Sequence, residues 1–366
     1  MQLSDPNVNL AIILPEIIIA ITGVVVMLYD CFFPKNRGIT GTMSLIGIAA
    51  AAISIALIWP GGSVPASAWG GMIVHDSLRL SFSVVFLLVA ALTILVSTVW
   101  IEREDVPGGE YHALLLFATF GMLLMSSGND LVVIFLGLET LSIATYVMAG
   151  LRKSDLKSNE SAMKYFILGS LASAFLLYGM ALVYGATGTM NITEIAAKAA
   201  DPNFPALLLV GAAMLVVGFG FKVAAAPFHV WTPDVYEGAP SPITGFMAAG
   251  PKAAAFASFL RIFVIGFPVV GGLEAAGYLN YSWTTALAVM AIATMTVGNV
   301  AAIMQNNVKR MLAYSSIAHA GYALVGFVGA GVAASQSNRD AAIAAVAFYM
   351  LSYAVANIGS FAIITL

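Results

Sequence analysis

About eleven apolar runs, each long enough to cross a membrane, fill most of this 366-residue chain. A bilayer core of about 30 Å requires roughly 20 apolar residues per helix. Only 9% of the residues are charged, whereas a soluble domain carries about 25%. The sequence therefore predicts an all-α polytopic membrane protein. Its helices are expected near 9–29, 41–59, 80–101, 111–127, 130–150, 160–185, 205–228, 241–267, 282–304, 308–331 and 341–366.

The sequence gives no sign of a redox or nucleotide site. One cysteine, Cys31, and four scattered histidines do not suggest a disulfide framework, a zinc site or an iron–sulfur cluster. Gly-rich phosphate loops and nucleotide fingerprints are also missing from the sequence. A net charge of −3 is too small to indicate nucleic acid. We therefore expect no metal, no cofactor and no nucleic-acid partner on this chain, whose surroundings are membrane lipid.

Basic residues predict the orientation in the membrane. The odd-numbered joins between runs hold eight basic residues and the even-numbered joins three. Cytoplasmic loops are the ones enriched in Lys and Arg, so the N-terminus should lie outside. One of the two longer joins contains 191–201, which is expected to form a short interfacial helix. The last run ends without a polar exit, and we expect the chain to be cut short.

Three charges inside the predicted helices are candidate functional residues. A charge at mid-membrane costs at least about 2.5–3.5 kcal/mol, so it faces a protein interior or water. Glu139, Lys222 and Lys252 lie at similar depth in three different runs. We expect them to form an electrostatic line across the membrane plane. The alternative is an ion network that only holds helices together.

Helix-weakening residues surround one of these lysines. Gly218 and Gly220 precede Lys222, and Pro227 follows it. They allow the helix to break, and broken membrane helices free backbone groups that need water or neighbouring side chains. We therefore expect an interruption between Gly218 and Pro227, with a hydrated cavity beside Lys222. An acid such as Glu139 at variable distance would then switch the proton affinity of this lysine.

Other polar residues inside the runs have simpler readings. Lys164 and Arg261 lie near helix ends, from which a long basic side chain can reach the interface. Glu16 is expected to make a structural hydrogen bond to another helix. His319, in the middle of a run, is either a hydrogen-bonded core histidine or a proton carrier.

The segment PFHVWTPDVYEGAPSPITGFMAAGPKAAAF (227–256) carries a family resemblance, supported by stretches 14–30, 129–150, 161–179 and 307–322. It resembles the antiporter-like membrane subunits of respiratory complex I. Within that group it is most similar to the subunit N family of bacterial NADH–quinone oxidoreductase, the counterpart of mitochondrial subunit 2. The PFHVWTPD part is shared with other ion-pumping relatives, whereas VYEGAP, GPKAAAF and the LPE start favour subunit N.

The resemblance implies a fourteen-helix fold with two inverted five-helix repeats and a broken helix 7. Helices 1–3 would then occupy 1–110, the first repeat 111–267, and an incomplete second repeat 282–366. This chain ends around the eleventh helix. We therefore expect a fragment that lacks the end of the proton path.

The resemblance also implies a function. The chain would be a proton-translocating subunit that couples electron transfer from NADH to quinone, in partner subunits, to proton pumping. The residues that match the family's relay are Glu139, Lys222, Lys252, Lys164 and His319.

The implied partners are the antiporter-like subunit M and small subunits such as K and J, in the bacterial inner membrane with the N-terminus in the periplasm. NADH, FMN, iron–sulfur clusters and quinone would be bound by partners. Two alternatives stay open. One is a subunit of a multisubunit cation/proton antiporter or ion-pumping hydrogenase, and the other is a structural membrane scaffold.

Overall fold

A computed structural model of the chain describes residues 9–33, 37–59, 66–199, 204–267 and 274–365. Within these residues, 11 helices are long and apolar enough to cross a membrane, which confirms the predicted number and fold class. The eleven are α1 (Leu14–Phe32), α2 (Arg37–Leu57), α3 (Ser77–Arg103), α4 (Gly108–Ser127), α5 (Leu131–Ala149), α6 (Leu156–Thr187), α8 (Pro205–Val223), α10 (Ser241–Leu260), α11 (Glu274–Ile303), α12 (Val308–Gly331) and α13 (Gln336–Thr365).

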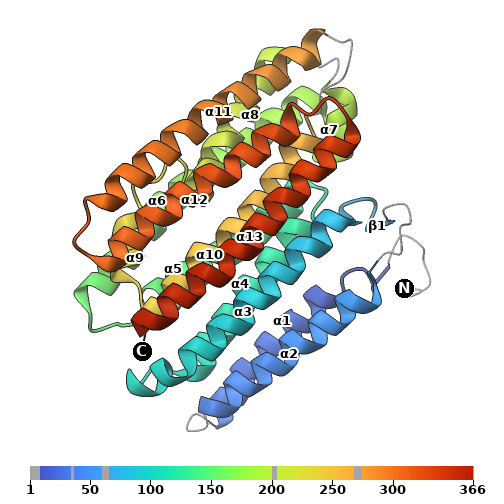
Figure 1. Cartoon of the computed structure of the whole chain (residues 1–366). Coiled ribbons are helices and arrows are strands. Elements are labelled where there is room, and N and C mark those ends of the chain that lie inside the picture. The colour runs from blue at the N-terminus through green and yellow to red at the C-terminus, as the bar shows by residue number, and fades with distance from the viewer. Residues whose placement is uncertain (1–8, 34–36, 60–65, 200–203, 268–273, 366) are drawn as a thin grey trace.

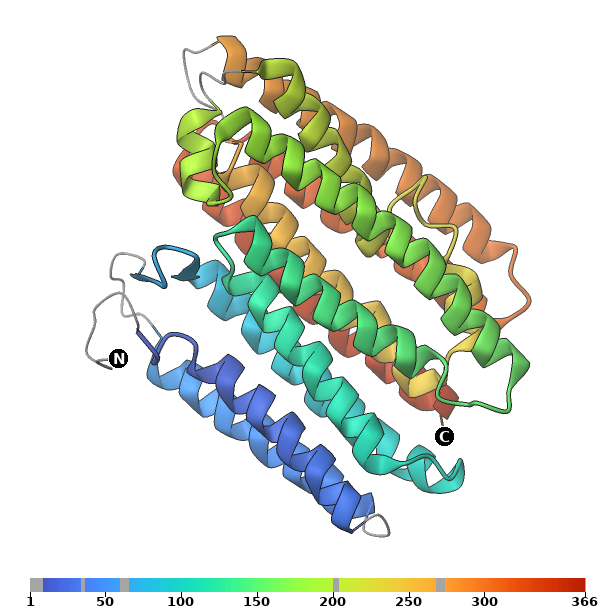
Figure 2. The ribbon, with the colours of Figure 1, turned by 180° about the vertical axis from the view of Figure 1, so that it is seen from behind.

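The long helices run roughly parallel to one another, with α1 and α2 at one edge of the bundle and α11 at the other (Figures 1 and 2). One end of the bundle holds the strands β1 (Ala66–Ala68) and β2 (Ile73–His75) and the short helix α7 (Ile192–Lys198). The other end holds the short helix α9 (Thr232–Gly238). We call these the β end and the α9 end.

Short elements close the β end. The helix expected within 191–201 forms as α7, whose first turn is capped by the Asn191 side chain. The antiparallel hairpin β1–β2 was not predicted. Its strands are only three residues each, too short for an alternating pattern to stand out. Asn129 donates to the carbonyl of Gly71 and to Thr193, which ties the hairpin to α7.

Helix α10 lies at the centre of the bundle. Every residue from Pro242 to Leu260 is buried, and the helix packs against α13, α3 and α4. Ala and Gly make up much of its sequence, and small residues let membrane helices approach closely. Beyond Leu260 it continues directly as a π-helix, Arg261–Ile265. Residues of α10 therefore contact helices from the N-terminal part of the chain, such as α3 and α4, and from its C-terminal part, such as α13.

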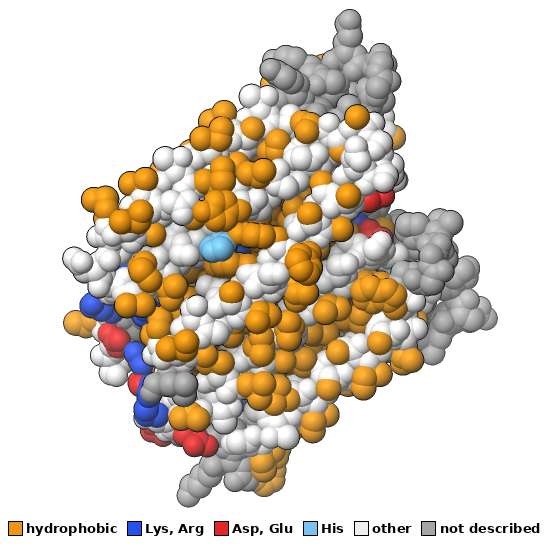
Figure 3. All heavy atoms as spheres, in the orientation of Figure 1, with side chains coloured by type: hydrophobic (Ala, Val, Ile, Leu, Met, Phe, Trp, Pro, Cys, Tyr) orange, Lys and Arg blue, Asp and Glu red, His pale blue; other side chains and the backbone are white. Residues whose placement is uncertain are grey.

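The surface of the bundle suits a bilayer. Apolar side chains cover the face seen in Figure 3, while Lys, Arg, Asp and Glu side chains gather mainly at the α9 end. Large exposed apolar side chains lie along α5, α6 and α13, for example Ile143, Ile167 and Phe348. A bundle with charged side chains at its ends and apolar side chains along its sides fits the environment of a bilayer.

Candidate functional site

The seventh span is broken beside Lys222, as predicted. Helix α8 ends at Val223, Ala224 has a left-handed backbone with φ +60°, and the chain then turns until α9 begins at Thr232. The predicted run continued to residue 228, so the helix is shorter than expected. The interruption itself is confirmed. A Cβ on Gly220 would lie 2.8 Å from the Phe228 ring, so the turn packs back on the helix only because this position is glycine.

Neighbouring side chains satisfy the backbone groups freed by this break. The backbone N–H of Ala226 donates to Thr294 Oγ1 at 2.9 Å, and the Trp231 indole donates to the Phe221 carbonyl at 3.1 Å. Non-helical backbone at membrane depth is tolerated where protein covers it in this way. The end of α8 is therefore fixed with its lysine inside the bundle.

Lys222 is 9% exposed and has two neutral partners on α5. Its Nζ donates to Ser142 Oγ at 2.7 Å and to Tyr146 Oη at 3.4 Å. The same Nζ lies 5.5 Å from the centroid of the Tyr146 ring, a cation–π contact. The ammonium group is thus held by hydroxyls and an aromatic face.

Glu139 lies one helical turn before Ser142 on α5, so the two side chains share a face of the helix. Its carboxylate accepts a hydrogen bond from Ser173 on α6. Among the ion pairs of the described residues, none joins Glu139 to Lys222. The expected coupling between the acid and the lysine is therefore not a direct ion pair, and Ser142, which bonds Lys222, lies one turn from Glu139 on the same helix.

Lys252 is 2% exposed, in the middle of α10. Its Nζ donates to the carbonyl and the hydroxyl of Ser316 on α12, at 2.9 and 2.5 Å. The Tyr236 ring centroid lies 5.9 Å from the same nitrogen. Like Lys222, this lysine has neutral partners only among the hydrogen bonds and ion pairs that the described residues make.

A small cavity lies beside Lys222, against α10. It has a volume of about 10 Å³ and is lined by Lys222, Ser142 and Tyr165 together with Met247 and Pro251 of α10. Pro251 has no N–H, so the Met247 carbonyl loses its helical donor. A cavity of roughly this size holds one water when polar partners are present. Lys252 follows Pro251 in α10, so the cavity adjoins the helix turn that carries the second lysine.

His319 continues the polar series. It lies one turn after Ser316 on α12, and its Nδ1 hydrogen-bonds the Tyr349 hydroxyl of α13 at 2.5 Å. The ring also lies 4.8 Å from the Tyr353 ring. His319 is hydrogen-bonded, and it also lies close to the Ser316 that bonds Lys252. Its position is therefore compatible both with a core histidine and with a proton carrier.

Lys164 lies apart from these residues, at the α9 end. It makes ion pairs of 2.7 Å with Glu160 and with Asp234 of α9. Arg310 of α12 reaches Asp234 at 2.7 Å and Glu237 at 3.0 Å, around a pocket of about 150 Å³. The hydrogen bond from Lys164 helps to hold the pKa of Asp234 below its usual range. The neighbour of Lys164, Tyr165, lines the cavity beside Lys222.

Sequence reasoning missed the neutral partners. Ser142 is three residues after Glu139, and Ser316 is three residues before His319. Each therefore shares a helix face with a predicted residue, and this spacing is the signal that could have found them. Asp234, the partner of Lys164, is 70 residues away from it in sequence and has no such signal.

The structure corrects one of the simpler readings and confirms another. Arg261 does not reach the interface: it is 1% exposed and bonds Asp76 through both terminal nitrogens, at 2.6 and 2.9 Å. The sequence reading was wrong because Asp76, which precedes α3, lies over the end of α10. Glu16 does make the expected contact with another helix, a 2.7 Å ion pair to Arg79 of α3.

Within the described chain, no group of three or more His, Cys, Asp or Glu is placed to hold a metal ion.

Comparison with known proteins identifies the family. A family model described as NADH:quinone oxidoreductase/Mrp antiporter, TM, matches residues 128–366. NADH-quinone oxidoreductase subunit N of Trichlorobacter lovleyi is 46% identical over 98% of this chain and 70% of the relative. The chain belongs to the subunit N family of NADH–quinone oxidoreductase. The family prediction is confirmed, and with it the assignment to a proton-translocating oxidoreductase complex.

Solved structures agree with this assignment. A chain of respiratory complex I from Thermus thermophilus, with bound aureothin, matches with a TM-score of 0.77 and 35% identity, over 96% of this chain and 70% of that one. A chain of the membrane-bound sulfane sulfur reductase, an archaeal respiratory membrane complex, matches with a TM-score of 0.76 and 26% identity, over the same 96% and 70%. The chain thus spans about 70% of the length of the curated subunit N relative and of both solved chains.

Proposed function

We propose that this chain moves protons through a relay of Glu139, Lys222 and Lys252 while its partner subunits carry electrons from NADH to quinone. The observation that carries the proposal is the pair of buried lysines held by neutral groups, with a water-sized cavity beside Lys222. A neutral lysine amine still donates to and accepts from a hydroxyl, so its site persists when the proton leaves. Buried ionisable groups in a membrane span mark proton relays for this reason.

Glu139 sets the charge state of Lys222. When the ionised carboxylate is near, Lys222 holds its proton; when the two separate, the proton passes by the cavity to Lys252. A membrane potential of 100 mV opposes the movement of one charge by about 2.3 kcal/mol. A change in the distance between the two charges supplies energy on this scale, because unlike charges about 4 Å apart interact by roughly 4 kcal/mol at an effective dielectric constant of about 20.

Lys164 and His319 stand at the two ends of the relay. Lys164 and Asp234 line the charged pocket at the α9 end, which makes that pocket a point of proton entry. His319 lies one turn from the Ser316 that holds Lys252, so it takes the proton onward. In this proposal the α9 end faces the cytoplasm, which agrees with the excess of basic residues in the joins at that end.

The proposal extends to the surroundings of the chain. It is a multi-pass protein of the bacterial inner membrane with a periplasmic N-terminus, and it has subunit M and small subunits such as K and J as neighbours. It binds no redox cofactor itself, because NADH, FMN, iron–sulfur clusters and quinone belong to the partners. Residues 1–110 form an N-terminal unit, 111–267 the first repeat, and 282–366 part of the second.

Glu139→Gln in the assembled complex tests the proposal. The variant keeps the shape and the hydrogen bond from Ser173 but removes the charge that switches Lys222. We expect assembly to be retained and the number of protons pumped per NADH oxidised to fall strongly, whereas the exposed Glu102→Gln control pumps normally. A structural scaffold would instead lose assembly and keep its pumping ratio. An independent cation/proton antiporter would exchange cations in liposomes without NADH.

A further inference from the structure

Each of the two buried lysines lies against an aromatic ring. The Lys222 ammonium group is 5.5 Å from the centroid of the Tyr146 ring, and the Lys252 group is 5.9 Å from that of Tyr236. The negative face of a ring attracts a cation within about 6 Å of its centroid. Two buried arginines at the β end have carboxylate partners instead. The rings therefore stabilise the charged lysines without carrying a formal negative charge.

A ring and a carboxylate differ as partners once the proton leaves. If a lysine paired with a buried carboxylate lost its proton, the carboxylate would stay behind as an unpaired buried charge, which is strongly unfavourable. A neutral ring leaves no such charge, and its face does not take the proton from the lysine. An aromatic partner therefore favours the protonated lysine and still permits its deprotonation.

Helix α9 carries the Tyr236 ring to Lys252. Tyr236 is completely buried, and among the described residues its hydroxyl has no hydrogen-bond partner of good geometry. The same helix carries Asp234 and Glu237, whose carboxylates make the ion pairs of the charged pocket. The acids of α9 thus fix the helix at the end of the bundle, while its tyrosine contributes a ring to the lysine site.

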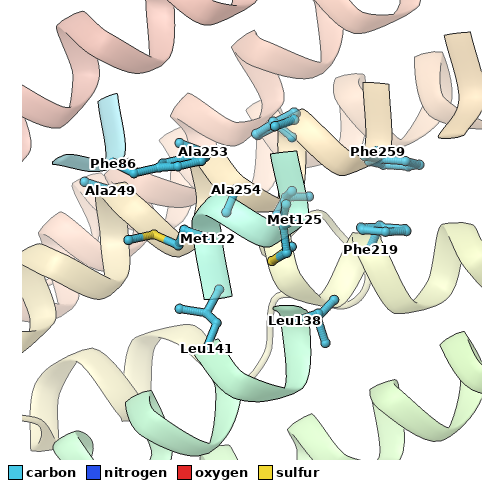
Figure 4. Close-up of a cluster of buried hydrophobic side chains, with 14 of the residues drawn as sticks. Phe86, Met122, Met125, Leu138, Leu141, Phe219, Ala249, Ala253, Ala254 and Phe259 are labelled. Carbon is cyan, nitrogen blue, oxygen red and sulfur yellow. The ribbon is translucent and has the colours of Figure 1, made fainter. Parts of the chain in front are cut away.

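The elements packed around α10 bring other groups to this region. The titratable ones are His319 of α12, Tyr353 of α13 and, at the cavity against Pro251, Lys222 of α8. On the sides of α3, α4 and α5, the neighbours labelled in Figure 4 are apolar: Phe86, Met122, Leu138 and Leu141. In the described part of the chain, no carboxylate forms an ion pair with Lys252. The Tyr236 ring is therefore the partner that favours its charged form.

We propose that Tyr236 is a positioning residue of the relay: α9 holds its ring over Lys252, where the ring stabilises the protonated lysine in place of a carboxylate. This inference rests on the proposed relay through Lys252. The simpler role for Tyr236 is to fill space beside Trp231, whose ring lies 6.1 Å away. That role affects stability at every pH and leaves the pH dependence of pumping unchanged.

The pH dependence of proton pumping separates the two roles. The assembled complex is reconstituted in liposomes, and the number of protons pumped per NADH oxidised is measured over a range of pH. Tyr236→Leu removes the ring, so Lys252 should take up a proton only at lower pH. We expect the alkaline limb of the profile to move down by about one pH unit, which corresponds to roughly 1.4 kcal/mol.

Two variants are matched controls. Tyr236→Phe removes only the hydroxyl and keeps the ring, so its profile should coincide with that of the wild type. Phe259→Leu removes an equally buried ring from the helix of Lys252. This ring stacks on Phe219 at 5.2 Å (Figure 4), and its loss should cost stability without moving the profile. A shift in Tyr236→Phe as large as that in Tyr236→Leu would overturn the role of the ring.

A fluorinated ring keeps the outcome decisive if Tyr236→Leu does not assemble. Replacing Tyr236 by pentafluorophenylalanine keeps the shape of the ring and withdraws electron density from its face. The profile should then move down as expected for Tyr236→Leu, and an unshifted profile would contradict the proposal.

Lys252→Met, measured in parallel, distinguishes failure of this proposal from failure of the relay. Pumping at the wild-type ratio in an assembled Lys252→Met complex would refute the relay through this lysine and the proposal with it. A strong loss of pumping in Lys252→Met, together with an unshifted profile in Tyr236→Leu, would refute the role of Tyr236 alone.

Discussion

Two sets of buried cations in this bundle have opposite partners. Lys222 and Lys252, near the middle of the bundle, bond hydroxyls and a carbonyl. Arg79 and Arg261, at the β end, bond carboxylates in ion pairs of 2.7 and 2.6 Å. A lysine with neutral partners can give up its proton and keep its contacts, whereas a paired arginine cannot. The difference separates groups that can move protons from groups that hold helices and charge in place.

Exchanging the two cation types should break this comparison most severely. Lys252→Arg puts a permanent charge on the relay, so proton pumping by the assembled complex should fall at least about 100-fold, because an arginine hardly deprotonates. The reverse change, Arg261→Lys, keeps a cation beside Asp76 and should preserve pumping. NADH-driven dye quenching in liposomes measures both. Normal pumping by Lys252→Arg would remove the distinction between the two sets.

Removing one member of an arginine pair should cost stability and not pumping stoichiometry. Arg79→Met leaves Glu16 charged and buried, which destabilises a protein by about 3–5 kcal/mol. Adding Glu16→Met should recover part of the loss, since no unpaired charge remains. Thermal unfolding of the purified complexes checks the expected order of stability, with the wild type highest, the double variant next and the Arg79→Met variant lowest. Equal melting temperatures for the single and double variants would contradict it.

Removing one neutral partner should have a moderate effect on pumping. Ser142→Ala deletes the hydroxyl that links Lys222 to the α5 turn of Glu139. A hydrogen bond to a charged group contributes about 1.5–3 kcal/mol, so we expect pumping to slow by roughly tenfold or more. Thr140→Val is the control, because its exposed hydroxyl bonds the Leu136 carbonyl of its own helix. Similar rates in both variants would show that Ser142 does not transmit the coupling.

The α9 end should give the smallest effect. Hydrogen bonds from Lys164 and Arg310 lower the pKa of Asp234, so its ion pairs stabilise the bundle above the ordinary pKa and are lost as pH falls through the lowered one. Asp234→Asn should therefore destabilise the complex at pH 7, by less than about 1 kcal/mol for such exposed pairs. The difference should shrink below about pH 4. Melting curves of the wild-type and Asp234→Asn complexes at pH 7 and below about pH 4 test this. A difference in melting temperature that grows in acid would contradict the prediction.

Sequence reasoning reached the spans and the charged candidates because their signals are local. Apolar length gave the eleven helices, and Gly218, Gly220 and Pro227 gave the break beside Lys222. Spacing from Glu139 and His319 could have marked Ser142 and Ser316 as candidates. Which lysine each one bonds was out of reach, since Lys222 and Lys252 are 80 and 64 residues away from them in sequence. Their pairing depends on how α5, α8, α10 and α12 pack.

Arg261 shows a second limit. Its depth in the run suggested a side chain reaching for the interface, because depth was all that the sequence offered. The deciding residue, Asp76, is 185 residues away in sequence and lies over the end of α10 only in the folded bundle. The hairpin β1–β2, in the same region, has strands of three residues and no detectable periodicity.

Lys222→Ala in the assembled complex tests the central claim most directly. The measurement is the number of protons taken up per NADH oxidised in liposomes, with the subunit composition of the complex checked in parallel. The account predicts a complete complex that pumps few protons and oxidises NADH more slowly, because the relay loses its first lysine beside the α8 break. A complete Lys222→Ala complex that pumps at the wild-type ratio would contradict it.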